Sequence, residues 1–116
     1  MTLIKHDGTV SSALIFSDKG TVTQGTSNST TVTLDTSCGV ITLFADANSA
    51  MSFTLNNSLI TTSSVILLTV ILKASTAGNS ATAAYEVPAS GSIKIHIAAA
   101  ELAGCEWRKV AFMVIN

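Results

Sequence analysis

Short segments in which apolar and polar residues alternate with a period of two dominate the chain from residue 21 onward, and this pattern constrains the fold most. Ser92–Ala98 (SIKIHIA) places three isoleucines on one face of a strand, with Lys94 and His96 on the other. Alternation of this kind is typical of β-strands that bury one face. It predicts about eight strands, at Thr21–Gln24, Thr31–Leu34, Cys38–Phe44, Met51–Leu55, Val65–Leu72, Ala83–Val87, Ser92–Ala98 and Lys109–Ile115.

The residues between these segments indicate how the strands connect. Turn-forming Gly, Ser, Asn and Pro separate the strands at intervals of about 8–12 residues. Short strands with such turns are the pattern of an antiparallel sandwich or jelly roll. We therefore predict an all-β fold, a single antiparallel β-sandwich that is jelly-roll-like. Within it, Gly39 is expected to mark a β-bulge, and residues 98–104 (AAAELAG) are expected to form one helical turn.

The first 19 residues fit this pattern less well than the rest. They hold a short apolar start at Leu3 and Ile4, a turn-like HDG, and an isolated SALIF run. A chain of 116 residues is about one domain long. We interpret residues 1–19 as an N-terminal arm on a β-sandwich domain of residues 20–116. Exchange of this arm between neighbouring copies is left open.

One expected strand, Val65–Leu72 (VILLTVIL), is apolar on both of its alternating faces. A helix is the alternative for such a run, but its length and its Val and Ile content favour a strand. Such a strand is either central in its sheet and covered on both sides, or has an outer face that meets another subunit. Because an uncovered apolar edge strand invites aggregation, we predict that both faces are buried.

Charged residues are scarce, at 11% of the chain against about 25% in typical soluble domains. Ser and Thr supply much of the polarity, so a Thr-rich surface is one explanation. Cover by identical subunits is the other. We favour subunit contacts because charged residues are depleted from interface cores and because the mean hydropathy is +0.52.

Charge and hydropathy argue against nucleic acid and membrane as partners. Net charge is −1 and the basic residues are scattered, so no patch is present to neutralise phosphates. The longest apolar run is far shorter than the ~20 residues of a membrane-spanning helix, and the N-terminus lacks the apolar core of a signal peptide. Cys38 and Cys105 have no metal-binding spacing, and we favour two free thiols in a reducing cytoplasm. A disulfide between them is the alternative, if the fold brings the two together.

No combination of residues typical of a catalytic site stands out. His6 and Asp7 are adjacent but lie in the arm, which would not hold them in a fixed geometry. His96 is interpreted as an exposed strand histidine, with a contact at the rim of an interface as the alternative. The seven carboxylates lack the paired spacing of a glycosidase and the pattern of a calcium loop. We therefore predict no enzyme activity, no cofactor and no metal site.

Glu106–Lys109 (EWRK) is the densest charged cluster and holds the only tryptophan. Packing of Trp107 over the end of the sandwich is the simpler interpretation. Trp and Arg are enriched at binding hot spots, however, so Trp107 and Arg108 are candidates for a subunit interface. Val65 and Leu67, on the strand that is apolar on both faces, are the other candidates.

The segment GTVTQGTSNSTTVTLDTSCGVITLF (20–44) is similar to a sequence found at the C-terminal ends of tailed-phage virion proteins. The later pattern matches as well, from SFTLNNSLITTSSVILLTV through GSIKIHI to the closing VAFMVIN. The resemblance covers about residues 20–116. It implies a β-sandwich module that trimerises and decorates heads or caps fibres. Family members often carry the module after a long fibre shaft, and the mere 19 residues before it here favour a head decoration protein.

The resemblance therefore implies a homotrimeric capsid decoration (cement) protein, bound to the major capsid protein on the outer surface of the virion. Its assembly is expected in the cytoplasm of the bacterial host. We expect contacts to the capsid from the arm, at Leu3, Ile4, Lys5 and His6. The alternative is a receptor- or carbohydrate-binding module of a head or tail fibre, which the low aromatic content of 5% disfavours.

Overall fold

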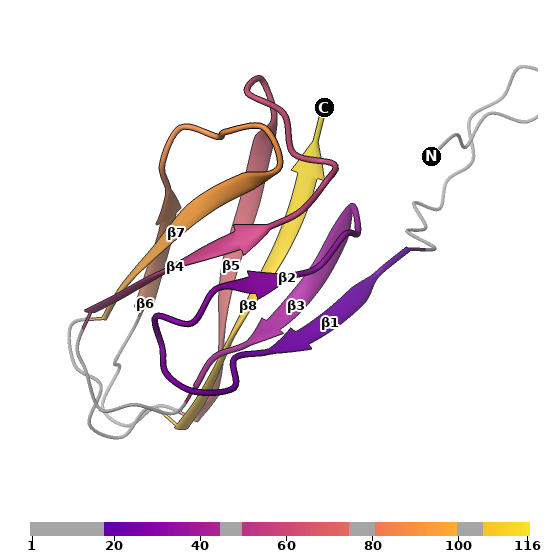
Figure 1. The fold of residues 1–116 in the computed structure, drawn as a ribbon. Coiled ribbons are helices and arrows are strands. Elements are labelled where there is room, and N and C mark those ends of the chain that lie inside the picture. Colours follow the sequence, from indigo (N-terminus) through magenta and orange to yellow (C-terminus); the bar gives the residue numbers. More distant parts are fainter. Residues whose placement is uncertain (1–17, 45–49, 75–80, 100–105) are drawn as a thin grey trace, which may run out of the picture.

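The computed structural model describes residues 18–44, 50–74, 81–99 and 106–116, which form an all-β fold (Figure 1). Eight strands make two four-stranded sheets, and no helix occurs in these ranges. Each segment predicted from alternation is a strand, with ends that differ by a few residues. The strands are β1 (Gly20–Thr23), β2 (Val32–Thr33), β3 (Cys38–Thr42), β4 (Ala50–Asn56), β5 (Val65–Ala74), β6 (Ala81–Tyr85), β7 (Ser92–Ala99) and β8 (Glu106–Ile115).

The helical turn predicted within residues 98–104 is not found where the structure describes that segment. Ala98 and Ala99 are the last residues of β7, and the remainder lies outside the described residues. Alanine has a high helix propensity, but here the register of β7 with its neighbours carries the strand on through both alanines.

The strands are ordered β1-β3-β8-β5 in sheet 1 and β2-β4-β7-β6 in sheet 2. The chain changes sheet at each step from β1 to β6, and again from β7 to β8 (Figure 1). β1 and β5 are therefore the edge strands of sheet 1, at opposite sides of that sheet. β2 and β6 are the edge strands of sheet 2.

The prediction of a purely antiparallel fold is wrong at two of the strand pairs. β1–β3 and β2–β4 are parallel, whereas β3–β8, β4–β7, β5–β8 and β6–β7 are antiparallel. Parallel neighbours cannot be joined by a hairpin and need a crossover connection. Here a strand of the opposite sheet lies within each crossover, because β2 separates β1 from β3 and β3 separates β2 from β4. Alternation along a strand reports its buried face and not the direction of its partner.

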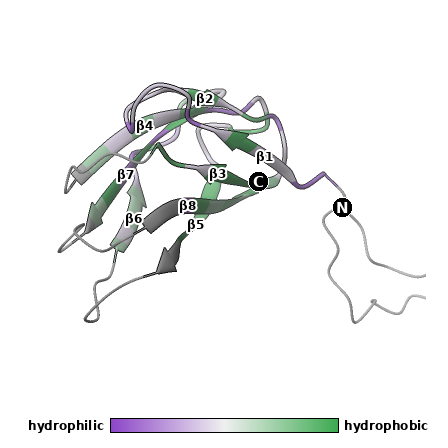
Figure 2. Cartoon of the chain, turned by 90° about the horizontal axis from the view of Figure 1, so that it is seen from below, coloured by the Kyte–Doolittle hydropathy of each residue, from purple (hydrophilic) through white to green (hydrophobic). Residues whose placement is uncertain are grey.

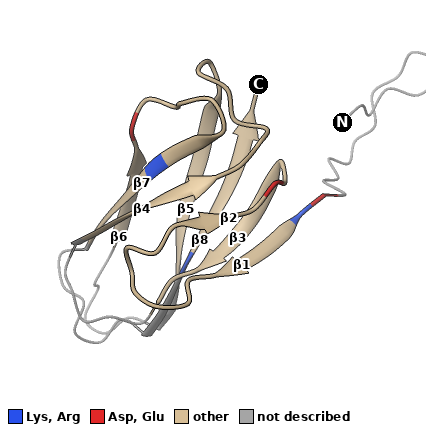
Figure 3. Cartoon of the chain, in the orientation of Figure 1, with Lys and Arg blue, Asp and Glu red and all other residues tan. Residues whose placement is uncertain are grey.

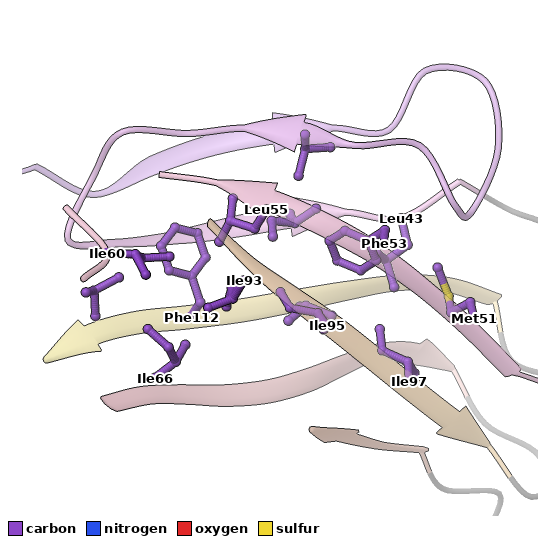
Figure 4. Close-up of a cluster of buried hydrophobic side chains, with 14 residues drawn as sticks. Leu43, Met51, Phe53, Leu55, Ile60, Ile66, Ile93, Ile95, Ile97 and Phe112 are labelled. Carbon is purple, nitrogen blue, oxygen red and sulfur yellow. The ribbon is translucent and has the colours of Figure 1, made fainter. Parts of the chain in front are cut away.

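The two sheets bury their facing sides in one hydrophobic core (Figure 4). Ile93, Ile95 and Ile97 of β7, which were predicted to share a face, are each at most 2% exposed. Hydrophobic residues follow the strands of both sheets (Figure 2). The core consists of Val32, Ile41, Leu43, Met51, Phe53, Leu55, Ile60, Ile66, Ile93, Ile95, Ile97, Val110, Phe112 and Val114.

Gly39 marks a close approach between neighbouring elements and not a bulge. β3 pairs with β8 in unbroken register through Gly39 and Phe112. A Cβ added at Gly39 would lie 2.7 Å from Leu34 Cδ2 and 2.9 Å from the backbone oxygen of Gly20. The predicted bulge is therefore wrong, because glycine is needed here for space and not for an extra residue in the strand.

Two buried amide side chains hold the loops between strands. Gln24, 2% exposed, donates from Nε2 to two carbonyls of its own loop and accepts the Phe44 N–H at 3.0 Å. Asn57, 1% exposed, donates from Nδ2 to the Thr36 carbonyl at 2.7 Å and accepts the Leu59 N–H at 2.9 Å. Each amide thus satisfies backbone groups that the sheets leave unpaired.

Candidate functional site

The pairing of β5 with β8 gathers eight residues on the outer side of sheet 1. Residues directly opposite each other on paired strands share a face, and the odd-numbered residues of both strands are opposite one another in this register. The even-numbered Ile66, Val110 and Phe112 are in the core, so the odd-numbered side chains point outward. We call this surface the β5–β8 face: Val65, Leu67, Thr69 and Ile71 with Ile115, Met113, Ala111 and Lys109.

The β5–β8 face is apolar and open in the single chain. Val65 is 51% exposed, Leu67 52%, Ile71 41% and Ile115 43%. Of the eight residues that define this face, Lys109, opposite Ile71, is the one that is charged. Scattered single aliphatic residues are normal on a protein surface, but a contiguous apolar patch marks an interaction site.

The structure excludes one of the two arrangements expected for Val65–Leu72, a central strand covered on both sides by its own chain. β5 is an edge strand of sheet 1, with β8 as its neighbour in the sheet, and its outer face is half-exposed, so the prediction of a strand buried on both faces is wrong within the single chain. Its inner face meets the core through Ile66, whereas Val65 and Leu67 lie outward and half-exposed. A local sequence cannot distinguish cover by its own chain from cover by another molecule, because both favour the same apolar residues.

The outer face of sheet 2 is polar in contrast. His96 of β7 lies opposite Ser52 of β4, and Lys94 lies opposite Thr54. Both basic side chains approach Glu86, at 2.9 Å for His96 Nε2 and 4.0 Å for Lys94 Nζ. The hydrogen bond from His96 lowers the pKa of Glu86 below its ordinary range. The exposed strand histidine expected at this position therefore has a carboxylate partner. Figure 3 shows that charged residues are few along the described chain.

A shallow hollow of about 380 Å³ lies over the same side of sheet 2. Its lining includes hydroxyl groups from Ser52 and Thr82, the His96 ring, and the small Ala84 and Ala98. Among the described residues, no aromatic side chain other than this imidazole lines the hollow. These residues can accept hydrogen-bonding groups but include no Trp, Tyr or Phe for a sugar ring to stack on.

Some of the predicted site residues belong to the described chain, and others lie outside it. Val65 and Leu67 lie side by side on the β5–β8 face. Trp107 and Arg108 belong to β8, where Arg108 pairs with Leu72, but their side chains fall outside the described residues. The proposed arm contacts also lie outside the described residues: Leu3, Ile4, Lys5 and His6.

Sequence reasoning missed Met113 and Ile115 as members of the candidate surface. The signal was present, because the last strand alternates with Val110, Phe112 and Val114 on one face and Ala111, Met113 and Ile115 on the other. Both faces are apolar, so the sequence did not say which of them meets the core. The partner strand decides this, since Leu67 and Met113 are opposite each other.

Two features are absent from the described ranges, a metal-binding cluster and a membrane-spanning helix. No cluster of three or more His, Cys, Asp or Glu side chains is found among them, and none of their elements is a helix long and apolar enough to cross a bilayer. Cys38 is a buried free thiol, and Cys105 lies outside the described residues. No protein-family model, curated protein or solved structure matches this chain.

Proposed function

We propose that the chain is a structural protein of a tailed-phage virion, a homotrimeric capsid decoration (cement) protein on the outer surface of the head. The observation that carries the proposal is the open β5–β8 face, which is apolar while the opposite outer face of the molecule is polar. A molecule with one apolar and one polar outer face is suited to assembly with the polar side toward solvent.

The exposed side chains of the β5–β8 face allow an estimate of the free energy gained when another copy covers this face. Fully burying one Val, Leu or Ile side chain is worth about 1.5–3 kcal/mol, so covering the open half of four such residues contributes about 3–6 kcal/mol. Association itself costs about 4–15 kcal/mol. The β5–β8 face can therefore direct self-association, but a stable trimer needs additional apolar surface from each copy.

The sequence resemblance supports a phage head as the place of assembly. A decoration protein that binds only the assembled capsid lattice stabilises that lattice by mass action. Trimer symmetry matches the local threefold axes of an icosahedral shell. We propose that the major capsid protein is contacted by the N-terminal arm, at Leu3, Ile4, Lys5 and His6.

We propose a jelly-roll-like β-sandwich, residues 20–116, with residues 1–19 as an arm. Two sheets around a shared core, with a chain that changes sheet repeatedly, support the sandwich. The parallel pairs β1–β3 and β2–β4 depart from an antiparallel jelly roll.

Capsids that lack this protein provide the test. Purified full-length chain should bind their outer surface in multiples of three and raise the temperature at which they release DNA. The matched variant Lys5→Ser/His6→Ser should bind more weakly while keeping its trimeric state. Failure of the unmodified chain to bind such capsids at micromolar concentration would overturn the proposed role.

A receptor- or carbohydrate-binding module is the second candidate, favoured by the hollow on sheet 2 with its hydroxyl and imidazole lining. Screening the full chain against an array of bacterial surface glycans tests it. Specific binding that is lost in His96→Ala and retained in Leu67→Ala would favour this function over decoration.

A further inference from the structure

A closed trimer needs two different contact surfaces on every copy. An apolar face that packs on the same face of a second copy gives a twofold dimer, whereas contact between two different patches closes a ring. The outer face of sheet 2 cannot serve as the second apolar surface, because it carries Lys94, His96 and Glu86. Under the proposed function, the surface that complements the β5–β8 face must therefore come from another part of the chain.

Ala13–Phe16 (ALIF) is the longest apolar run outside the described ranges. It carries no charge and has serine on either side. The three internal segments outside the described ranges consist of small, polar or charged residues, apart from Leu102. An uncharged aliphatic and aromatic run is the chemical complement of a face whose eight defining residues include one charge, at Lys109.

The described residues show where this run joins the domain. Both carboxylate oxygens of Asp18 are held by Ser37, Oδ2 accepting its backbone N–H at 2.7 Å and Oδ1 its hydroxyl at 2.5 Å. Asp18 precedes β1, and β1 is the edge strand opposite β5 in sheet 1. Three strand spacings, about 14 Å, separate those two edges. Phe16 lies two residues before Asp18 and so within about 7 Å of it.

We propose that the Ala13–Phe16 run of one copy packs on the β5–β8 face of the next copy, so that three such contacts close the ring. This inference rests on the proposed homotrimer. The run is joined through Ser17 and Asp18 to β1, one edge strand of sheet 1, and the face that accepts it includes β5, the other edge strand. A head-to-tail ring brings these two edges of neighbouring copies together. The run also supplies the additional apolar surface that a stable trimer requires.

Full-length variants test the contact from both sides. In sedimentation equilibrium, Leu67→Ser on the face should weaken each contact of the trimer by about 3- to 12-fold, the value of the open half of one Leu side chain. Leu14→Ser/Ile15→Ser in the run removes two apolar side chains and should weaken the trimer more. Leu3→Ser/Ile4→Ser is the control in the arm, and Val87→Ser, at a residue 88% exposed outside the face, is the control in the domain. Both controls should leave the trimer intact. If the dissociation constant of the trimer is unchanged in Leu14→Ser/Ile15→Ser, this inference is overturned, while the proposed function stands.

Crosslinking distinguishes exchange between copies from cover within one copy. A photo-crosslinking residue is placed at position 15 of the full chain, and unlabelled copies are mixed with ¹⁵N-labelled copies. Mass spectrometry should then find position 15 linked to β5 or β8 peptides that carry the other isotope label. Links confined to the same copy, or no link to β5 or β8, would overturn the proposal. A full-length chain that is monomeric at micromolar concentration would instead overturn the trimer itself.

Discussion

Ile66 and Leu67 are neighbours on β5 whose side chains point to opposite faces, and they form a matched pair for testing which face is open. Ile66 is 3% exposed, whereas Leu67 is 52% exposed. Truncating a buried Ile to Ala costs about 2–5 kcal/mol. Full burial of a Leu side chain is worth about 1.5–3 kcal/mol, so truncating the half-buried Leu67 should cost only about 1 kcal/mol in a single chain.

Urea unfolding at two protein concentrations separates the stability of the single chain from that of the assembly. At a concentration low enough for dissociation, Ile66→Ala should lower the free energy of unfolding by about 2–5 kcal/mol and Leu67→Ala by about 1 kcal/mol. At high concentration the cost of Leu67→Ala should increase, because binding of folded copies adds to apparent stability. The cost of Ile66→Ala should not change. Equally large costs for both variants at low concentration would refute the reasoning, since Leu67 would then be buried within its own chain.

Three further predictions concern local interactions. Gly39→Ala should lower the free energy of unfolding by about 1–3 kcal/mol because its Cβ would overlap its neighbours; Gly25→Ala, with open space around it, is the control, and equal thermal midpoints would contradict the packing argument. Asn57→Ala should cost about 1–3 kcal/mol because two backbone groups lose their buried partner; an unchanged urea midpoint would count against this. Glu86→Gln should make the free energy of unfolding depend less on pH in the acid range. The hydrogen bond from His96 lowers the pKa of Glu86 below its ordinary 4.5. The carboxylate therefore contributes to stability above pH 4.5, and this contribution is lost as the pH falls through the lowered pKa. Identical dependence of the unfolding free energy on pH in the variant and the unmodified chain would exclude this contribution.

Strand positions could be predicted from the sequence because they follow from the alternation of single residues. Ile93, Ile95 and Ile97 share a face by spacing alone, and all of them are in the core. The direction of strand pairing could not be predicted in the same way. β1 and β2 pair in parallel with β3 and β4 because the intervening strands lie in the opposite sheet, and alternation contains no information about that connection.

The candidate surface could be predicted only in part. Val65 and Leu67 were selected because their strand is apolar on both faces, and the structure places them outward. Burial of both faces within one chain was a wrong prediction, because β5 is an edge strand and not a central one and its outer face is half-exposed. Met113 and Ile115 join the face through their register with β5, a long-range fact that no local pattern contains.

The buried amides show a second limit of sequence reasoning. Gln24 and Asn57 are among the least exposed residues of the described chain, yet a polar residue beside a turn is expected at the surface. Both are buried because their side chains pair with backbone groups of loops, at Phe44 for Gln24 and at Thr36 for Asn57. Such pairing depends on loops that meet only after the sheets have packed.

A cryo-EM map of the native phage particle is the most direct test of the central claim. The proposed function predicts this chain on the outer surface of the capsid, as three copies around a threefold axis, with the β5–β8 face of each copy covered by its neighbour. A particle whose head lacks the chain, or in which the β5–β8 face is open to solvent, would contradict the claim.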